Sequence, residues 1–325
     1  MTSSIASQEN AIDSSHDGTA RKTGQQRARL RESMTAYLFI LPTLLAFVLF
    51  MALPMVLTAI LSLYEWTGIS LETLTFVGLD NYERLFQDPV FYTALGNNLV
   101  VIVLGTVLSV GLGLFLAVLL ERALPGSNFF RGLFFMPTVI SGVVIAIVFT
   151  FLLSPVFGVL PPFFALFGID FETALLGDPS TVLYTIIGIQ VWRTFGFAMF
   201  LFVAGLKALD ETLDEAAKID GANGWQIFWN ITFPQLRPVT LLVATLVGID
   251  GLKLFDVVFI MTLGGPQNAS EVLATYSYSQ GFQFNAVGFG SSIALVLLII
   301  TFILTIVRFR LLPDEAKPQK KKVAR

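Results

Sequence analysis

Four charged residues lie inside long apolar segments of this 325-residue chain: Arg193, Asp250, Lys253 and Asp256. If those segments cross a bilayer, each charge costs at least ~3 kcal/mol unless it faces protein or water and finds a partner. Asp250 and Lys253, like Lys253 and Asp256, are three residues apart and would share a helix face. The spacing predicts a structural ion pair or, with Arg193, the charged lining of a path through the membrane.

Other site chemistry is largely excluded by composition. The chain has no cysteine and a single histidine, His16, in a polar N-terminal segment, so disulfides, thiolate sites and multi-histidine metal sites are excluded. It also has no Gly-Lys pair, which a phosphate-binding P-loop requires, and no Gly-x-Ser-x-Gly. We therefore expect no catalytic residues, no metal and no cofactor bound by this chain.

The segment 210–234 carries the most informative motif. Asp210 can cap a short helix, Gly221 and Gly224 permit a sharp turn, and Pro234 ends a second short helix. An apolar stripe at helical spacing occupies that second helix, formed by Trp225, Phe228 and Trp229.

This segment resembles the EAA motif of ABC-importer permeases. Glu215-Ala216-Ala217 is followed at the family's spacing by Gly221, Ile231 and Phe233-Pro234, with Phe233 in place of the usual leucine. Segment 76–82 resembles the family's first outer loop. Phe255-Asp256 and segment 262–266 resemble the span-five exit of carbohydrate-type permeases, such as those for maltose, lactose and glycerol phosphate. The resemblance covers about residues 35–312, although Gly158-Val-Leu-Pro161-Pro162 departs from the family's Gly-x-x-Asn.

The resemblance implies an all-α type I importer permease fold in the bacterial inner membrane. It implies a heterodimer with a second permease, two ATPase subunits that hold ATP and Mg, an extracytoplasmic solute-binding protein, and a sugar as substrate. The residues that would couple the chain to the ATPase are Glu215, Ala216, Ala217, Gly221, Ile231 and Pro234.

Substrate contacts in this family come from the spans that flank the EAA loop. By position, and with the two intramembrane basic residues, the predicted path comprises Arg193, Thr194, Phe197, Asp250, Gly251, Lys253 and Leu254. Glycerol phosphate is the alternative substrate, because Arg193 and Lys253 suit an anion, although Asp250 and Asp256 offset their charge.

Composition requires a membrane environment for this chain. Hydrophobic residues make up 55% and charged residues 13%, against about 25% charged in ordinary soluble domains. Apolar windows near the ~20 residues needed for crossing predict six transmembrane helices. They lie at about 37–63, 98–120, 132–153, 182–206, 239–263 and 288–307, whereas 156–168 is too short and predicts a loop or interfacial half-helix.

The basic residues predict the orientation. Of the 20 Lys and Arg residues, 17 lie on one side of the predicted helices and Arg84 alone lies on the other. The positive-inside rule places both termini in the cytoplasm. We expect a disordered cytoplasmic tail at 1–35, a transmembrane domain at 36–312 with its coupling loop at about 207–237, and a basic cytoplasmic tail at 313–325.

Two other function classes compete with the importer permease. A stand-alone secondary transporter predicts an inverted repeat with broken helices in matching positions, and none is evident. A membrane-embedded enzyme needs a clustered nucleophile, metal or acid–base set, which this composition lacks. Besides its protein partners, the chain is expected to contact lipid and no nucleic acid.

Overall fold

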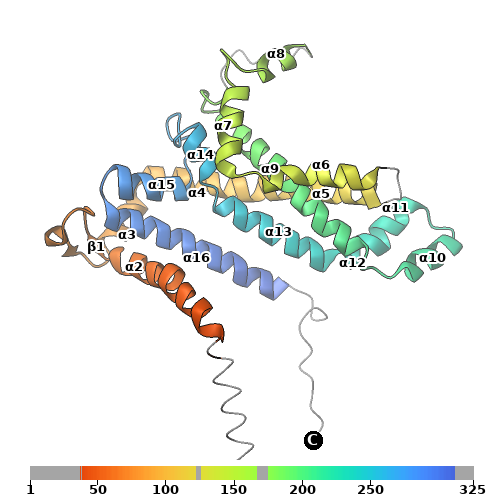
Figure 1. The fold of residues 1–325 in the computed structure, drawn as a ribbon, viewed down its shortest axis with the longest axis horizontal. Coiled ribbons are helices and arrows are strands. Elements are labelled where there is room, and N and C mark those ends of the chain that lie inside the picture. The colour runs from red at the N-terminus through yellow and green to blue at the C-terminus, as the bar shows by residue number, and fades with distance from the viewer. Residues whose placement is uncertain (1–36, 38, 122–125, 167–174, 312–325) are drawn as a thin grey trace, which may run out of the picture. The chain divides into compact units, whose positions relative to one another are not determined.

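The computed structural model describes residues 37, 39–121, 126–166 and 175–311 (Figure 1). The predicted tails at 1–35 and 313–325 lie outside the described residues. Contacts divide the chain into two units, residues 1–58 and 59–325, which are described separately.

The first apolar helix covers Phe39–Leu61, within the predicted first span. It contains a π-helical turn, η1 (Val48–Ala52), followed by α2 (Leu53–Leu61). Pro54 lacks the N–H that a regular helix would donate to the preceding turn, which accounts for the local widening beside it.

The second span is longer than its apolar window. α4 (Pro89–Val100), the π turn η3 (Val101–Gly105) and α5 (Thr106–Glu121) form one helix of 33 residues. It begins at Pro89, because the Asp88 carboxylate accepts a hydrogen bond from the Val90 N–H (2.8 Å) and proline suits the first helical position.

The third predicted span is not one straight helix. α6 (Ser127–Val139) and α7 (Gly142–Leu152) meet at 97°, with extended backbone at Ile140. Pro137 removes one helical N–H shortly before the break, and Gly142 restarts the helix where Asp256 packs against it. A six-residue helix, α8 (Leu160–Ala165), falls in the segment predicted to be a loop or half-helix.

The fourth span, α9 (Val182–Leu206), is the central helix of the unit formed by residues 59–325. In its membrane window, 61% of residues are buried, against 22% for α4–α5 and for α16 (Val287–Leu311). A Cβ on Gly196 would lie 1.9 Å from the Phe134 carbonyl oxygen, so glycine permits the close approach of α9 and α6.

The fifth predicted span is broken. α13 (Arg237–Leu252) ends at Leu252, and α14 (Asp256–Met261) starts after three non-helical residues. Leu252 and Leu254 at this break are 1% and 4% exposed. Non-helical backbone at membrane depth is tolerated where protein buries it. The prediction of one continuous helix over 239–263 is therefore wrong.

Short elements at opposite ends complete this unit (Figure 1). At one end lie β1 (Tyr64–Glu65), η2 (Leu71–Thr73), β2 (Thr75–Phe76), α3 (Asp80–Gln87), α15 (Leu273–Tyr278) and η5 (Ser279–Gln283). The strands pair antiparallel, with Tyr64 opposite Phe76. At the other end lie α10 (Glu211–Ile219), α11 (Gly224–Ile227), η4 (Phe228–Thr232) and α12 (Phe233–Gln235).

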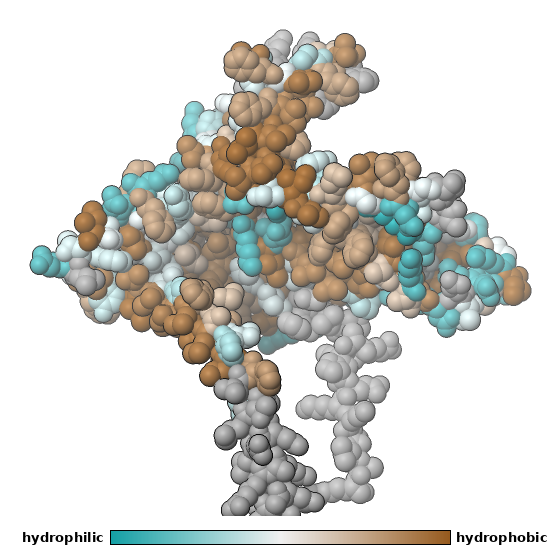
Figure 2. Space-filling model, in the orientation of Figure 1, coloured by the Kyte–Doolittle hydropathy of each residue, from teal (hydrophilic) through white to brown (hydrophobic). Residues whose placement is uncertain are grey.

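The surface between these ends suits lipid. Hydrophobic residues cover most of the helical surface visible in Figure 2, and hydrophilic residues gather toward both ends. Among the described residues, four helices are long and apolar enough to cross a membrane, or five if α6 and α7 form one bent span. The chain is thus a multi-pass membrane protein, while six spans and cytoplasmic termini remain predictions.

Candidate translocation site and coupling loop

A cavity of about 310 Å³ lies among α6, α9 and α13. It is lined by Thr138, Arg193, Thr194, Phe197, Leu246, Val247 and Asp250. Four predicted path residues, Arg193, Thr194, Phe197 and Asp250, therefore meet in one cavity, although α9 and α13 are separated in sequence by the whole coupling loop.

An ion pair forms the polar centre of this cavity. Arg193 Nη2 lies 2.5 Å from Asp250 Oδ2, and the side chains are 22% and 44% exposed. Gln190 Nε2 donates to the same oxygen at 2.6 Å. Because guanidinium and carboxylate are paired, the site carries both donors and acceptors with little net charge.

Two buried polar atoms of this network have no partner among the described residues: Arg193 Nε, a donor, and Gln190 Oε1, an acceptor. An unpaired buried polar group costs about 1–3 kcal/mol. Both atoms are buried and Gln190 does not line the cavity, so a solute or water would reach them only if neighbouring side chains moved.

Hydroxyl groups connect the helices around the ion pair. Thr138 Oγ1 donates to the Arg193 carbonyl at 2.9 Å, joining α6 to α9. Ser109 and Thr194 hydroxyls lie 2.8 Å apart and join α5 to α9, while Thr194 also donates to the Gln190 carbonyl. These contacts hold the Arg193 turn of α9 in place.

The three other predicted path residues are placed differently. Lys253 and Asp256 are exposed and pair neither with each other nor with Asp250, so the predicted Asp250–Lys253 and Lys253–Asp256 pairs are wrong. The break after Lys253 separates it from Asp256, and the Asp250 carboxylate is paired with Arg193 instead of Lys253. Gly251 and Leu254 are buried and do not line this cavity.

Asn98 supports the helix break, and the sequence did not identify it. It is 1% exposed; its Oδ1 accepts from the Leu273 N–H at 2.8 Å, and its Nδ2 donates to the Leu252 carbonyl at 3.5 Å. Asn97 donates to the carbonyls of Ala269 and Glu271. Two adjacent asparagines in an apolar window were the available signal, because a buried amide needs partners.

The coupling loop folds by local hydrogen bonds. Asp210 caps α10 by accepting from the side chain and backbone of Thr212, and these bonds lower the pKa of its carboxyl. Asn223 and Gln226 form a reciprocal capping box at the start of α11, each bond 2.9 Å. Between α10 and α11, Gly221 has φ +83°, a left-handed conformation that glycine adopts readily.

The predicted coupling residues lie on this loop, and much of its surface is uncovered. Glu215, Ala216, Gly221 and Pro234 are exposed, whereas Ala217 and Ile231 are half-buried. Trp225 is 72% exposed and contacts Trp229, whose ring centroid lies 5.6 Å away. The ring of Phe228 lies 5.2 Å from Trp229, so the predicted stripe is a contiguous aromatic cluster, which Phe233 extends.

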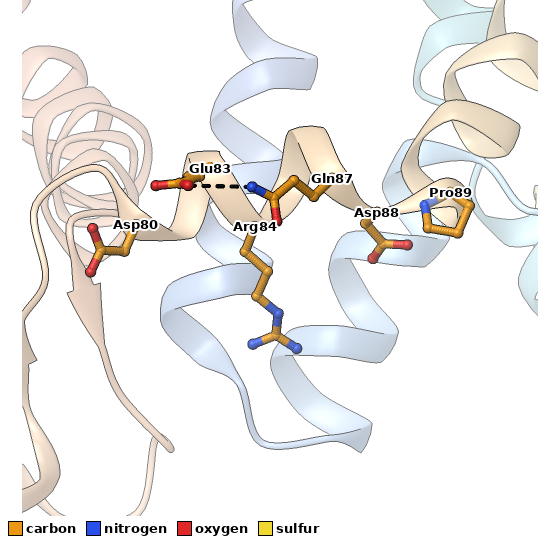
Figure 3. Close-up of a pocket in the computed structure, with 6 residues that line it drawn as sticks. All are labelled: Asp80, Glu83, Arg84, Gln87, Asp88 and Pro89. Carbon is orange, nitrogen blue, oxygen red and sulfur yellow. Dashed lines mark hydrogen bonds between the residues drawn. The ribbon is translucent and has the colours of Figure 1, made fainter.

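At the opposite end, an open cavity of about 470 Å³ lies along α3 (Figure 3). Glu83 and Gln87 share a hydrogen bond, while Arg84 extends toward α16 and lies 4.3 Å from the Phe289 ring centroid. Asp88 accepts a hydrogen bond from the Tyr276 hydroxyl. Burial, reinforced by that bond, raises the pKa of Tyr276, so this acidic end is tied to α15 and α16.

A buried carboxyl lies beside this end, in the loop between α14 and α15. Glu271 is 5% exposed and accepts from the Thr275 hydroxyl at 2.5 Å. Burial raises its pKa, since desolvation disfavours the charged carboxylate.

Comparisons with known proteins agree with this architecture. The family model described as "Binding-protein-dependent transport system inner membrane component" matches residues 109–314. The probable ABC transporter permease protein YurN of Bacillus subtilis is 40% identical over 277 residues, covering 84% of this chain and 94% of that protein.

Two further likenesses bear on substrate and fold. The multiple sugar-binding transport system permease protein MsmF of Streptococcus mutans is 34% identical, covering 84% of this chain and 93% of that protein. A chain from the crystal structure of a bacterial ABC transporter that imports the acidic polysaccharide alginate has a TM-score of 0.75 at 22% identity, covering 89% of this chain and 100% of that chain. The similarity to the alginate transporter chain confirms the predicted all-α permease fold.

Proposed function

Because the chain belongs to the family of binding-protein-dependent transport system inner membrane components, the permeases of ABC transporters, we propose that it transports a sugar. In this proposal the chain forms the translocation path with a sister permease. An extracytoplasmic binding protein delivers the sugar, and two separate ATPase subunits bind the exposed loop at about 207–237.

The observation that carries the proposal is the cavity centred on Arg193 and Asp250. It places a neutralised ion pair and an aromatic side chain between α9 and α13, the helices that flank the coupling loop. A movement of the loop would act directly on both cavity walls.

A neutral sugar suits this cavity better than an anion. The carboxylate of Asp250 can accept from one sugar hydroxyl and the guanidinium of Arg193 can donate to its neighbour, while Phe197 offers an apolar face. The similarity to a multiple sugar-binding permease supports the same substrate class. Glycerol phosphate remains the alternative, and it would need Arg193 to exchange Asp250 for the phosphate.

The coupling loop offers a rigid, exposed contact for the ATPase. Its two short helices are capped at Asp210 and Asn223, and the Gly221 turn between them is open, since a Cβ built there has no neighbour within 4 Å. We expect ATP and Mg to be held entirely by the partner subunits. ATPase closure would move the loop, and with it α9 and α13.

Uptake by the reconstituted transporter tests the proposal. Asp250→Asn keeps the side-chain shape and removes the charge that holds Arg193, so we expect at least tenfold slower uptake of labelled neutral sugars at normal assembly. Asp256→Asn is the matched control, because Asp256 is exposed and lies outside the cavity. Uptake that responds equally to both variants would contradict the proposed path. Uptake of glycerol phosphate in place of sugars would favour the alternative.

A further inference from the structure

Four aromatic rings form a continuous row beside the helix break. Phe255, at the start of α14, stacks on Phe259 with ring centroids 5.0 Å apart and planes 14° apart. Phe259 meets Tyr278 at 4.9 Å and 75°. Tyr278, at the end of α15, meets Phe282 of η5 at 5.1 Å and 31°. Tyr278 also meets Phe255 edge-on, at 5.5 Å and 67°. The row thus comprises one stacked pair, Phe255 and Phe259, and one tilted pair, Tyr278 and Phe282, joined by edge contacts of Tyr278.

The row is accessible, unlike the neighbouring aromatic packing. Phe282 is 71% exposed, and the other three rings are half-buried. Tyr276, two residues before Tyr278 on the same helix, is only 3% exposed and donates to Asp88. The Tyr278 hydroxyl, by contrast, has no hydrogen bond among the described residues. Packing therefore accounts for Tyr276 and leaves the Tyr278 hydroxyl and the exposed ring of Phe282 unexplained.

The row also joins the outer end of the molecule to the helix break. Phe282 lies in η5, at the end opposite the coupling loop (Figure 1). Phe255 follows Leu254 at the helix break, five residues beyond Asp250 of the cavity. The row therefore runs from the end where a solute would enter to the break that ends α13, the helix whose Asp250 lines the cavity.

We propose that Phe282, Tyr278, Phe259 and Phe255 form a stacking track for the apolar faces of sugar rings between the outer end and the cavity. This inference rests on the proposed sugar transport and extends it to an oligosaccharide. Sugar rings carry C–H faces that pack on aromatic rings, and the free Tyr278 hydroxyl supplies a hydrogen bond. Two platforms joined at an angle would contact consecutive sugar units, so longer chains gain more from the track.

The whole reconstituted transporter, with its binding protein, tests the track through the ratio of sugar transported to ATP hydrolysed. We expect Phe282→Ala and Tyr278→Ala to lower this ratio about threefold to tenfold for an oligosaccharide and less for a monosaccharide. Stimulation of ATP hydrolysis by the sugar-loaded binding protein should be unchanged. Tyr276→Phe is the matched control, because its ring is buried away from the row.

Four outcomes would overturn the track. If assembly or thermal stability falls while the ratio is unchanged, the row only packs the protein. If stimulation of ATP hydrolysis falls and the KM for the loaded binding protein rises, the row docks that protein. If the wild type transports no sugar, the proposed function fails with it, whereas normal wild-type uptake with an unchanged ratio in both variants refutes the track alone.

Discussion

The coupling loop and the helix break in the fifth predicted span are both interruptions between helices, but different forces set their conformations. Asp210, Gly221 and Asn223 shape the loop through bonds to residues a few positions away. The break between Leu252 and Asp256 depends on Asn98 and Leu273, far away in sequence. A local interruption can move as a unit, whereas one built from distant contacts couples several helices.

Substitution of Asn98, which supports the helix break, should have the largest effect on stability. Asn98→Ala leaves the Leu273 N–H and the Leu252 carbonyl without their partner, at about 1–3 kcal/mol each. We expect about 3 kcal/mol less free energy of unfolding, measured by denaturation in detergent. Asn97→Ala, at a half-buried neighbour, should lose about 1 kcal/mol; equal losses would show that Asn98 does not support the break.

Arg193 should have the next largest effect, because its contacts are also long-range. Arg193→Met leaves Asp250 unpaired, which costs 3–5 kcal/mol in a fully buried site. Since the Asp250 side chain is 44% exposed, we expect the free energy of unfolding to fall by about 2 kcal/mol. The double variant Arg193→Met/Asp250→Leu should regain stability but not uptake. A double variant no more stable than the single one would mean that the ion pair is not what links α9 to α13.

The loop should respond to local geometry in a different way. Valine is strained by about 1–2 kcal/mol at the left-handed φ of Gly221, whereas asparagine tolerates it. We expect Gly221→Val to reduce uptake about 5–30-fold with little change in unfolding, because the loop is exposed. Gly221→Asn should remain close to wild type, and equal uptake by both variants would contradict a role for this turn.

Glu271 should give the smallest effect, visible as a pH dependence. Its folded-state pKa is raised above the ordinary value of 4.5, so the folded protein holds the proton longer than the unfolded chain. Stability is then lost as pH rises from about 4.5 through the folded pKa. Glu271→Gln should remove this loss and be the more stable form at neutral pH. If the melting temperatures of both proteins changed with pH in the same way, the buried-carboxyl account would be refuted.

The same contrast explains what the sequence could predict. The spans 182–206 and 288–307, the Asp210 cap and the Gly221 turn follow from hydrophobicity and short-range chemistry, and the structure confirms them as helices, cap and turn. The Asp250–Lys253 pairing failed because spacing within one helix cannot reveal a competing partner on another helix. The partner of Asp250 is Arg193, 57 residues away in sequence, and only tertiary packing brings them together.

Cysteine accessibility tests the central claim, that the Arg193–Asp250 cavity is the sugar path, most directly, because the chain has no native cysteine. Phe197→Cys would sit in the cavity, and Phe200→Cys, on the same helix, would sit at a 55% exposed position outside it. In the energised transporter, sugar should protect Phe197→Cys from a small thiol reagent and leave Phe200→Cys unprotected. Labelling of Phe197→Cys that is indifferent to sugar would contradict the claim.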